Sequence, residues 1–498
     1  MRLFFLPPSI LCQNLLLLLF FLYINNTDTN LNKETHNMDV WSPSLNVDYE
    51  FAKLINRMHP PRVAVDNVTD KNATLIKVDS ANKRGSLLEV VQVLTDMNIF
   101  IKKAYISSDG GWFMDVFHVT DQYGNKLSEG NVADRIQQSL GPRGCSFRSL
   151  RGSVGVQFAM QHTTIELTGR DRPGLLSEIF AVLSDFKCNV GSAEIWTHNS
   201  RIASVVYITD NETRLPIEDP DRLTKIKELL LFILKGDPDK RDGHTMVSPG
   251  STHTQRRLHQ LMYADRDYDI DEYESSEQSE SSRSVKPLVT VENCAEKGYT
   301  VLHLKCPDRP KLLFDAVCTL TDMQYVVSHA SINAEGPNSC QEFFIRHMDG
   351  CPISSEAERQ RVIHCIKAAI KRRTPEGVRL DLCGEDRVGF LADVTRIFRE
   401  NALSITRAEV TTIGSKAVNT FYVVDSSGDE IKSKTIEAVR KEIGVDVIKV
   451  TEDIVIPIVN PEPIPHHTGR FSFRKLVRTK SEKFLYNLGL ISSYSDVV

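Results

Sequence analysis

Residues 171–176 are Asp-Arg-Pro-Gly-Leu-Leu, a hexapeptide that returns in altered form elsewhere in the chain. Residues 308–313 are Asp-Arg-Pro-Lys-Leu-Leu, residues 386–391 are Asp-Arg-Val-Gly-Phe-Leu, and a weaker copy at residues 82–87 is Asn-Lys-Arg-Gly-Ser-Leu. Recurrence of one pattern along a chain indicates a repeated structural unit. The sequence therefore predicts four copies of one small module, which we number 1 to 4 in chain order.

Each hexapeptide stands between a predicted strand and a predicted helix. The strands are the short apolar or alternating runs at residues 74–78, 164–167, 300–304 and 378–382. Beyond each hexapeptide, hydrophobic residues recur at helical spacing, as they do at Leu176, Ile179, Phe180 and Leu183. An acidic residue also occupies the same place in the first helical turn of every copy, where the helix dipole favours a carboxylate: Glu89, Glu178, Asp315 and Asp393.

The rest of each module predicts a hairpin and a second helix. In the fourth copy, alternating runs at 403–412 and 417–424 are followed by a helical pattern at 435–443 and an edge strand at 446–450. This βαββαβ order predicts an α+β fold of tandem ferredoxin-like modules, whose antiparallel sheets are covered by helices on one face. Such small units bury little surface alone, so we expect them to stack sheet to sheet or edge to edge, within the chain or between chains.

At about 100 to 200 residues per domain, the length of 498 residues predicts about three to five domains. The predicted modules span 70–150, 160–236, 297–375 and 376–452. A linker at 237–290 separates them into two pairs; its acidic, serine-rich half predicts disorder, as a solvated tether or, alternatively, a phosphorylation switch. Residues 453–498 contain a proline-rich spacer and a basic amphipathic tail, expected to dock on the protein, a partner or an anionic surface.

Residues 1–37 form an apolar extension that resembles a signal-anchor segment. The alternative is that Met38 is the working start. We expect a cytoplasmic or nuclear protein if translation begins near Met38, and a membrane-associated one if the apolar segment is retained. The net charge of -5 gives no global attraction for nucleic acid, and the ten cysteines lack zinc-site spacing, so no metal site is predicted.

The hexapeptide can bind a small zwitterion. A strand that enters a helix through a glycine-ended turn exposes backbone N–H groups at the positive helix terminus, which suit a carboxylate. The aspartate at the start of the loop can accept a hydrogen bond from an ammonium group. The structural alternative is that Asp caps the helix, Pro starts it and Gly permits close packing, and for one loop taken alone this alternative is favoured.

In this arrangement the hexapeptides resemble the ACT domain, and four copies without an attached enzyme resemble the plant ACT-domain-repeat family, from roughly Met38 to the C-terminus. Residues 252–268 also resemble a segment typical of that family. The paired C-terminal modules of bacterial uridylyltransferases, which sense glutamine, are similar as well. The resemblance implies amino-acid binding at module interfaces, through the loop and the start of the following strand, without a cofactor.

The second and fourth copies match the family pattern best, the second together with Asn189. The third has Lys311 in place of glycine, and the first lacks both aspartate and proline, so we expect these two sites to have lost ligand binding and kept only packing. The apolar extension also departs from the family pattern. The candidate amino-acid-binding residues are Asp171, Arg172, Pro173, Gly174, Leu175, Asn189, Asp386, Arg387, Gly389, Phe390, Asp308 and Arg309.

No P-loop, zinc-protease or serine-hydrolase motif is found, so we predict no catalytic residues and no enzyme activity. RNA-recognition modules share the βαββαβ order, but the third strands at 112–118 and 202–207 lack their basic-aromatic pattern. A ligand-free association scaffold is a further alternative. The preferred hypothesis is a sensor in which a free amino acid, bound across paired modules, changes conformation or affinity for an unidentified protein partner.

Overall fold

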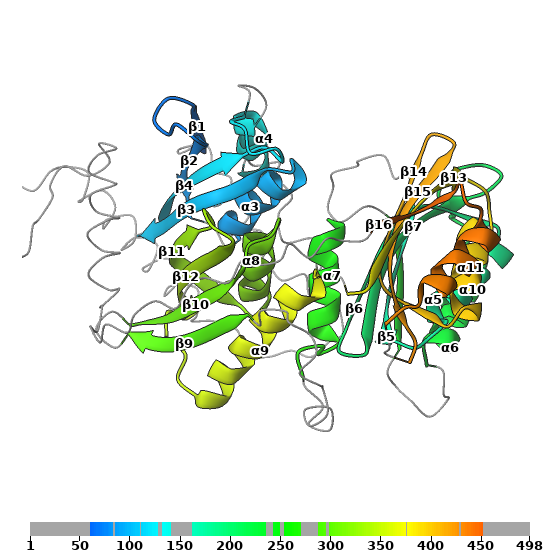
Figure 1. Cartoon of the computed structure of the whole chain (residues 1–498). Coiled ribbons are helices and arrows are strands. Elements are labelled where there is room, and N and C mark those ends of the chain that lie inside the picture. The colour runs from blue at the N-terminus through cyan, green and yellow to red at the C-terminus, as the bar shows by residue number, and fades with distance from the viewer. Residues whose placement is uncertain are drawn as a thin grey trace, which may run out of the picture. The chain divides into compact units, whose positions relative to one another are not determined.

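The computed structural model describes residues 60–82, 85–109, 111–127, 132–140, 162–235, 243–249, 253–269, 287–294, 298–374, 376–427 and 430–451. The predictions for the apolar extension, the acidic half of the linker and the basic tail fall outside these residues. In the part of the chain that is described, no helix is long and apolar enough to cross a membrane. The described strands form two eight-stranded sheets (Figure 1).

Modules 1 and 3 share the first sheet, in the order β1-β2-β4-β3-β11-β12-β10-β9. Strands β3 and β11 join the modules edge to edge as an antiparallel pair, from Lys103 opposite Asn333 to Ser107 opposite His329. The strands are β1 (Arg62–Asp66), β2 (Thr74–Ala81), β3 (Phe100–Asp109), β4 (Trp112–Thr120), β9 (Leu288–Cys294), β10 (Tyr299–Pro307), β11 (Tyr325–Asn333) and β12 (Asn338–His347).

Modules 2 and 4 share the second sheet, in the order β16-β13-β15-β14-β6-β7-β5-β8. Strands β6 and β14 pair antiparallel, from Ser192 opposite Thr411 to Trp196 opposite Arg407. The strands are β5 (Thr163–Arg170), β6 (Cys188–His198), β7 (Arg201–Asp210), β8 (His244–Pro249), β13 (Val378–Glu385), β14 (Leu403–Ile413), β15 (Lys416–Asp425) and β16 (Ile448–Thr451).

The modules pair across the linker rather than on either side of it. The expected edge-to-edge association occurs within the chain, but module 1 pairs with module 3 and module 2 with module 4. In every module the second strand would otherwise be a sheet edge with unpaired backbone groups, and pairing two such strands removes both edges. The division into two pairs by the linker therefore describes the sequence order and not the packing.

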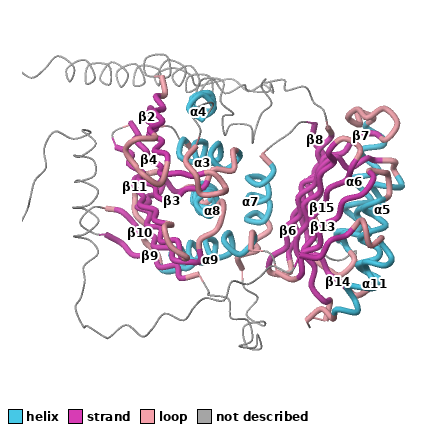
Figure 2. The backbone as a smooth tube through the Cα atoms, turned by 45° about the horizontal axis from the view of Figure 1, so that its top comes forward, coloured by secondary structure: helices cyan, strands magenta, loops and turns pink. Residues whose placement is uncertain are grey.

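Helices cover one face of each sheet (Figure 2). The first sheet carries α3 (Ser86–Asp96), α4 (Val132–Leu140), α8 (Leu312–Asp322) and α9 (Glu356–Arg372), and the second carries α5 (Leu175–Asp185), α6 (Pro220–Lys235), α10 (Phe390–Glu400) and α11 (Ser433–Ile443). The predicted apolar face of α5 is buried, with Ile179 and Leu183 each 1% exposed. These facts confirm the predicted ferredoxin-like α+β modules.

The strand order βαββαβ holds for modules 2 and 4, whose last strands are β8 and β16. In modules 1 and 3 the same edge position, beside the first strand of the repeat, is filled by the preceding strands β1 and β9. The edge can be filled from either chain direction because an antiparallel neighbour needs only backbone partners. Three strands consequently lie outside the expected module bounds: β1 before residue 70, and β8 and β9 within or at the end of 237–290.

Part of the predicted linker is a helix, α7 (Thr254–Ala264), that packs on the second sheet. Leu258, Leu261 and Met262 form a buried cluster with Trp196 and Tyr207, which lie on the sheet face opposite α5 and α10. On its other side α7 contacts α8, as Figure 2 also shows. Residues 253–268 therefore form an ordered element within the predicted linker.

Buried ion pairs hold α7 in place. Arg256 binds both carboxylate oxygens of Asp322 in α8, and Arg257 binds both oxygens of Glu166 in β5 at 2.8 Å. The Nε2 atom of His259 lies 2.8 Å from Asp315 of α8. Glu166 belongs to module 2, whereas Asp315 and Asp322 belong to module 3, so α7 connects these two modules.

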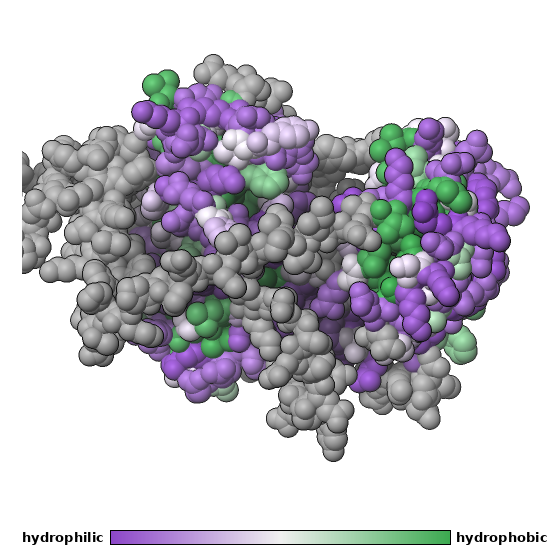
Figure 3. Space-filling view, viewed as in Figure 1, coloured by the Kyte–Doolittle hydropathy of each residue, from purple (hydrophilic) through white to green (hydrophobic). Residues whose placement is uncertain are grey.

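Helix α7 does not cover the whole open face of the second sheet. In module 4, Ile413 and Val418 on that face are 65% and 40% exposed. Figure 3 shows hydrophobic residues gathered on the part of the surface formed by modules 2 and 4. The buried apolar contacts of α7 are thus confined to the module 2 half of this sheet.

Candidate functional site

The loop formed by each hexapeptide is fixed at both ends. The backbone N–H of its first residue donates to a hairpin turn, from Asp171 to Ser200 O at 2.9 Å and from Asp386 to Ser415 O at 2.9 Å. The loop ends in the left-handed conformation, with φ of 82° at Gly174, 86° at Gly389 and 67° at Lys311. Glycine adopts this conformation freely, whereas for a residue with a Cβ it costs about 1 to 2 kcal/mol of conformational free energy.

The loop arginines bind the first-turn acids. Arg172 donates to Glu178 at 3.0 Å, Arg309 lies 2.7 Å from Asp315, and Arg387 donates to Asp393 at 2.6 Å. This pairing explains why the repeats share both an arginine and an acid six residues later. No side chain caps α5, α8 or α10, so the loop aspartates do not have the capping role that the structural alternative gave them.

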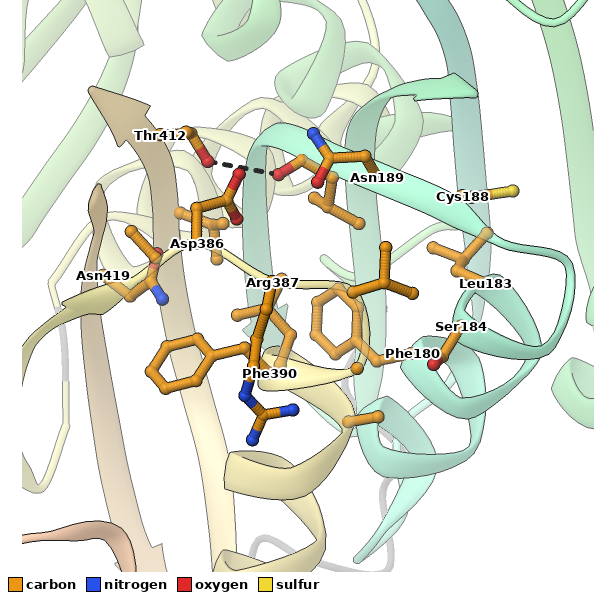
Figure 4. A pocket seen from close by; sticks show the side chains of 17 residues that line it. Phe180, Leu183, Ser184, Cys188, Asn189, Asp386, Arg387, Phe390, Thr412 and Asn419 are labelled. Atoms are coloured by element: carbon orange, nitrogen blue, oxygen red, sulfur yellow. Dashed lines mark hydrogen bonds between the residues drawn. The ribbon is translucent and has the colours of Figure 1, made fainter. Parts of the chain in front are cut away.

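A cavity that is partly open to solvent lies between the module 4 loop and module 2, and its empty volume of about 400 Å³ includes open solvent. The loop contributes Asp386, Arg387, Gly389 and Phe390, and module 2 contributes residues from α5 and the start of β6. In Figure 4, Asp386 and Thr412 lie together with Asn189 of module 2. The Thr412 hydroxyl donates to Val190 O at 3.5 Å across this interface. We call this space the module 4 cavity.

Asn189 therefore faces the fourth loop and not the second, with which the sequence analysis grouped it. The reason is the edge-to-edge pairing: the start of β6 and the end of α5 lie against the loop of the paired module. A site built from a loop and the start of a second strand thus combines residues of two modules.

An equivalent cavity lies between the module 3 loop and module 1, and its empty volume of about 490 Å³ also includes open solvent. Asp308, Arg309 and Lys311 line it from the loop, and Phe100 and Lys102 line it from module 1. The third copy was expected to keep only packing because it lacks glycine. That expectation stays a prediction. A cavity is present beside the loop because Lys311 adopts the left-handed conformation, and its Nζ donates to Gln255 of α7 at 3.1 Å. We call this space the module 3 cavity.

Each cavity is lined by a buried amide with at least one atom that has no hydrogen-bond partner among the described residues. Asn419, 1% exposed, lines the module 4 cavity, and neither its amide nitrogen nor its oxygen has a partner. Gln341, 3% exposed, lines the module 3 cavity; its Nε2 donates to Ser339 at 3.2 Å, but its Oε1 has no partner. A buried polar atom left unpaired costs about 1 to 3 kcal/mol, so such atoms point to a missing ligand or water.

The second loop, which matches the family pattern best, is closed. A Cβ built on Gly174 would lie 2.6 Å from Cδ of Arg399, so this side chain of α10 covers the glycine. Leu175 is 1% exposed and belongs to the core, whereas Pro173 is exposed. Burial raises the pKa of Asp171 to about 7. Close packing at the interface with module 4 occupies the space that a ligand would need.

The aspartates of the two cavities are short of positive charge. Burial raises the pKa of Asp386, opposed chiefly by Arg214, whose guanidinium lies 3.9 Å away. Burial also raises the pKa of Asp308, and the charge of Lys102 is the main influence that lowers it. A carboxylate that burial destabilises gains from an approaching ammonium group. Among the described residues, no group of three or more His, Cys, Asp and Glu side chains could hold a metal ion.

The sequence analysis missed the two amides, although a signal was present. The residue four positions before each loop pairs with one position of the third strand: Val78 with Asp115, Leu167 with Ser204, Leu304 with Gln341 and Leu382 with Asn419. That position is buried and polar in every module, between apolar core residues. Aligning the third strands of the repeats would have found it.

Comparisons with known proteins agree with this architecture. A model of the ACR family N-terminal ACT domain matches residues 69–146, the ACT domain model matches 163–219 and 378–444, and a model of the ACR9-like, ACT-like domain matches 288–380. A bifunctional uridylyltransferase/uridylyl-removing enzyme of Bradyrhizobium is 30% identical over 161 residues, which are 28% of this chain and 17% of that enzyme.

Two relatives from Arabidopsis thaliana match nearly from end to end. ACT domain-containing protein ACR4 is 55% identical over 456 residues, covering 91% of this chain and 99% of the relative. ACT domain-containing protein ACR5 is 55% identical over 464 residues, covering 92% and 100%. The chain therefore belongs to the plant ACR family of ACT-domain repeat proteins.

Proposed function

We propose that this protein is a non-catalytic regulator that binds free amino acids in the module 3 and module 4 cavities. One observation carries the proposal: two equivalent cavities, each at the start of a helix, are lined by a buried amide with unpaired atoms. A dry packing interface would favour an apolar residue at Asn419 and Gln341. A ligand that hydrogen-bonds to these amides removes the cost of burying them.

The lining groups suit a zwitterion. The ammonium group binds Asp386 or Asp308, and the carboxylate binds backbone N–H groups where α10 or α8 begins. The side chain of the ligand then extends towards Asn419 or Gln341. Since each cavity is formed by two modules, a bound amino acid stabilises their pairing, and a coupling of about 1 to 3 kcal/mol would change affinity for a partner protein.

The test is calorimetric binding and thermal unfolding of the full chain against the common amino acids. A true ligand stabilises the protein by about 2.7 kcal/mol at 100 times its Kd. Asn419→Leu and Gln341→Leu should each remove one binding event. The matched control is Ser204→Ala, the same position in module 2, whose loop is closed, and it should leave binding unchanged. Failure of every amino acid to bind the folded wild type would favour an association scaffold.

A further inference from the structure

The two cavities are equivalent in position but differ in charge. Both are lined by residues at or next to the bulge in a second strand, which interrupts β6 between Val190 and Ser192 and β3 between Ile101 and Lys103. The position of Asn189 in β6 is occupied by Phe100 in β3, and that of Gly191 is occupied by Lys102. Lys102 lines the module 3 cavity and influences the charge of Asp308.

The module 3 cavity has a lining lysine that forms no ion pair in the described part of the chain. Arg309 is neutralised by Asp315 at 2.7 Å. Lys311 donates at 3.1 Å to Gln255 of α7, and the carboxylates of Glu194, Glu409 and Asp315 favour its charged form. Lys102 makes no ion pair with any residue that the structure describes, whereas its neighbour Lys103 lies 2.6 Å from Glu335. Lys102 is therefore a lining cation without an ion pair among these residues, at the position that Gly191 occupies beside the module 4 cavity.

The charges of the module 4 cavity are balanced. Arg387 is bound to Asp393 at 2.6 Å, and Asp386 has Arg214 at 3.9 Å. The remaining polar groups that line this cavity are uncharged and include Ser184, Asn189, Thr412 and Asn419. A zwitterion with an uncharged side chain keeps this balance, whereas an additional charge would have no partner.

We propose that the two cavities select different amino acids: the module 3 cavity takes one with a carboxylate side chain, which Lys102 binds, and the module 4 cavity takes one with an uncharged polar side chain, which Asn419 binds. This inference rests on the proposed function and adds Lys102 and Asn419 as specificity-determining residues. The buried, unpaired Oε1 of Gln341 gives the module 3 cavity a second polar group for the ligand.

The experiment is calorimetric titration of the full chain with L-aspartate and L-glutamate, and separately with L-serine, L-threonine, L-asparagine and L-glutamine. Lys102→Met should weaken binding of the acidic ligand about tenfold or more, as expected for loss of a charge-assisted hydrogen bond, and leave the uncharged ligand unaffected. Asn419→Leu should do the reverse. Lys103→Met, which removes a lysine already paired with Glu335, is the matched control and should change neither affinity.

Two results overturn this inference while leaving the proposed function in place. One is that a single amino acid binds in both cavities. Calorimetry would then detect two binding events, and each cavity variant would remove one of them. The other is an acidic ligand whose affinity does not respond to Lys102→Met. If wild-type protein with a cooperative thermal transition binds none of the six amino acids but binds others, this inference fails alone. If it binds no amino acid, both proposals fail.

Discussion

At the scale of single residues, the polar position of the third strand distinguishes the modules. It is Asn419 or Gln341 beside a cavity and Ser204 beneath the closed loop. In module 1 it is Asp115, 1% exposed, and burial raises its pKa well above the usual range, opposed only in part by the backbone amide of Ser107. A carboxyl group in that environment is held in its neutral form.

Replacing this carboxyl group should stabilise the protein in a pH-dependent way. The folded-state pKa of Asp115 lies above the unfolded value of 3.8, so the folded state binds more protons and stability falls as pH rises above 3.8. Asp115→Leu removes that loss and should raise the free energy of unfolding by about 1 to 3 kcal/mol at pH 7, and by less at pH 4. Urea unfolding at both pH values measures this. Equal destabilisation at both would contradict a neutral, buried Asp115.

Gly174 should be sensitive to substitution for two separable reasons. Gly174→Ala places a Cβ in the left-handed region at φ 82° and against Arg399, whereas Gly111→Ala, at φ 89°, meets nothing within 4 Å. The control should lose about 1 kcal/mol of unfolding free energy and Gly174→Ala clearly more, because the Arg399 side chain must move. Equal losses in denaturant unfolding would show that Arg399 does not cover the loop.

At the scale of elements, the loops and their helices could be predicted from sequence, but α7 could not. Hexapeptide, strand and apolar periodicity repeat together, so the helices beginning at Leu175 and Phe390 follow from pattern alone. Helix α7 is rich in arginine and histidine, which indicates a polar surface segment. Those side chains are buried because acids of α8 and β5 bind them, and these contacts exist only in the tertiary structure.

The segment after α7 offers a matched pair of acids. Asp267 is buried and accepts hydrogen bonds from Nε and Nη2 of Arg372, whereas Asp269 forms an exposed pair with Arg266 at 2.8 Å. Asp267→Asn should cost about 3 kcal/mol of unfolding free energy, because it leaves a buried arginine without its counter-ion. Asp269→Asn should cost less than about 1 kcal/mol. Similar denaturation midpoints for the two variants would contradict the burial of this ion pair.

At the scale of the molecule, sequence repeats identify the modules but not their partners. The hexapeptides are alike in every copy and carry no information on which strand edges meet. That choice depends on contacts such as that of Arg407 in β14 with Glu194 in β6, which a single sequence does not reveal. The sequence analysis assigned no strand at β1 or β9, because the repeat pattern does not show from which chain direction the edge is filled.

Module 1 pairs with module 3 and module 2 with module 4, so the two halves of the chain should stay together after the backbone is cut. A protease site inserted between residues 274 and 280 separates modules 1 and 2 from modules 3 and 4 in sequence, but β3–β11 and β6–β14 still join them. After cleavage the fragments should co-elute at the mass of the whole chain and separate only in denaturant. Fragments that separate under native conditions would contradict the pairing.

The central claim is that ligands bind at the third and fourth loops and not at the second. Amide hydrogen exchange of the full chain, with and without saturating amino acid, tests it most directly. The account predicts slower exchange at 386–390 with 188–190, at 308–312 with 99–102, or at both sets according to the ligand, and none at 171–174. Protection centred on 171–174, or protection at none of these segments with an amino acid that demonstrably binds, would contradict it.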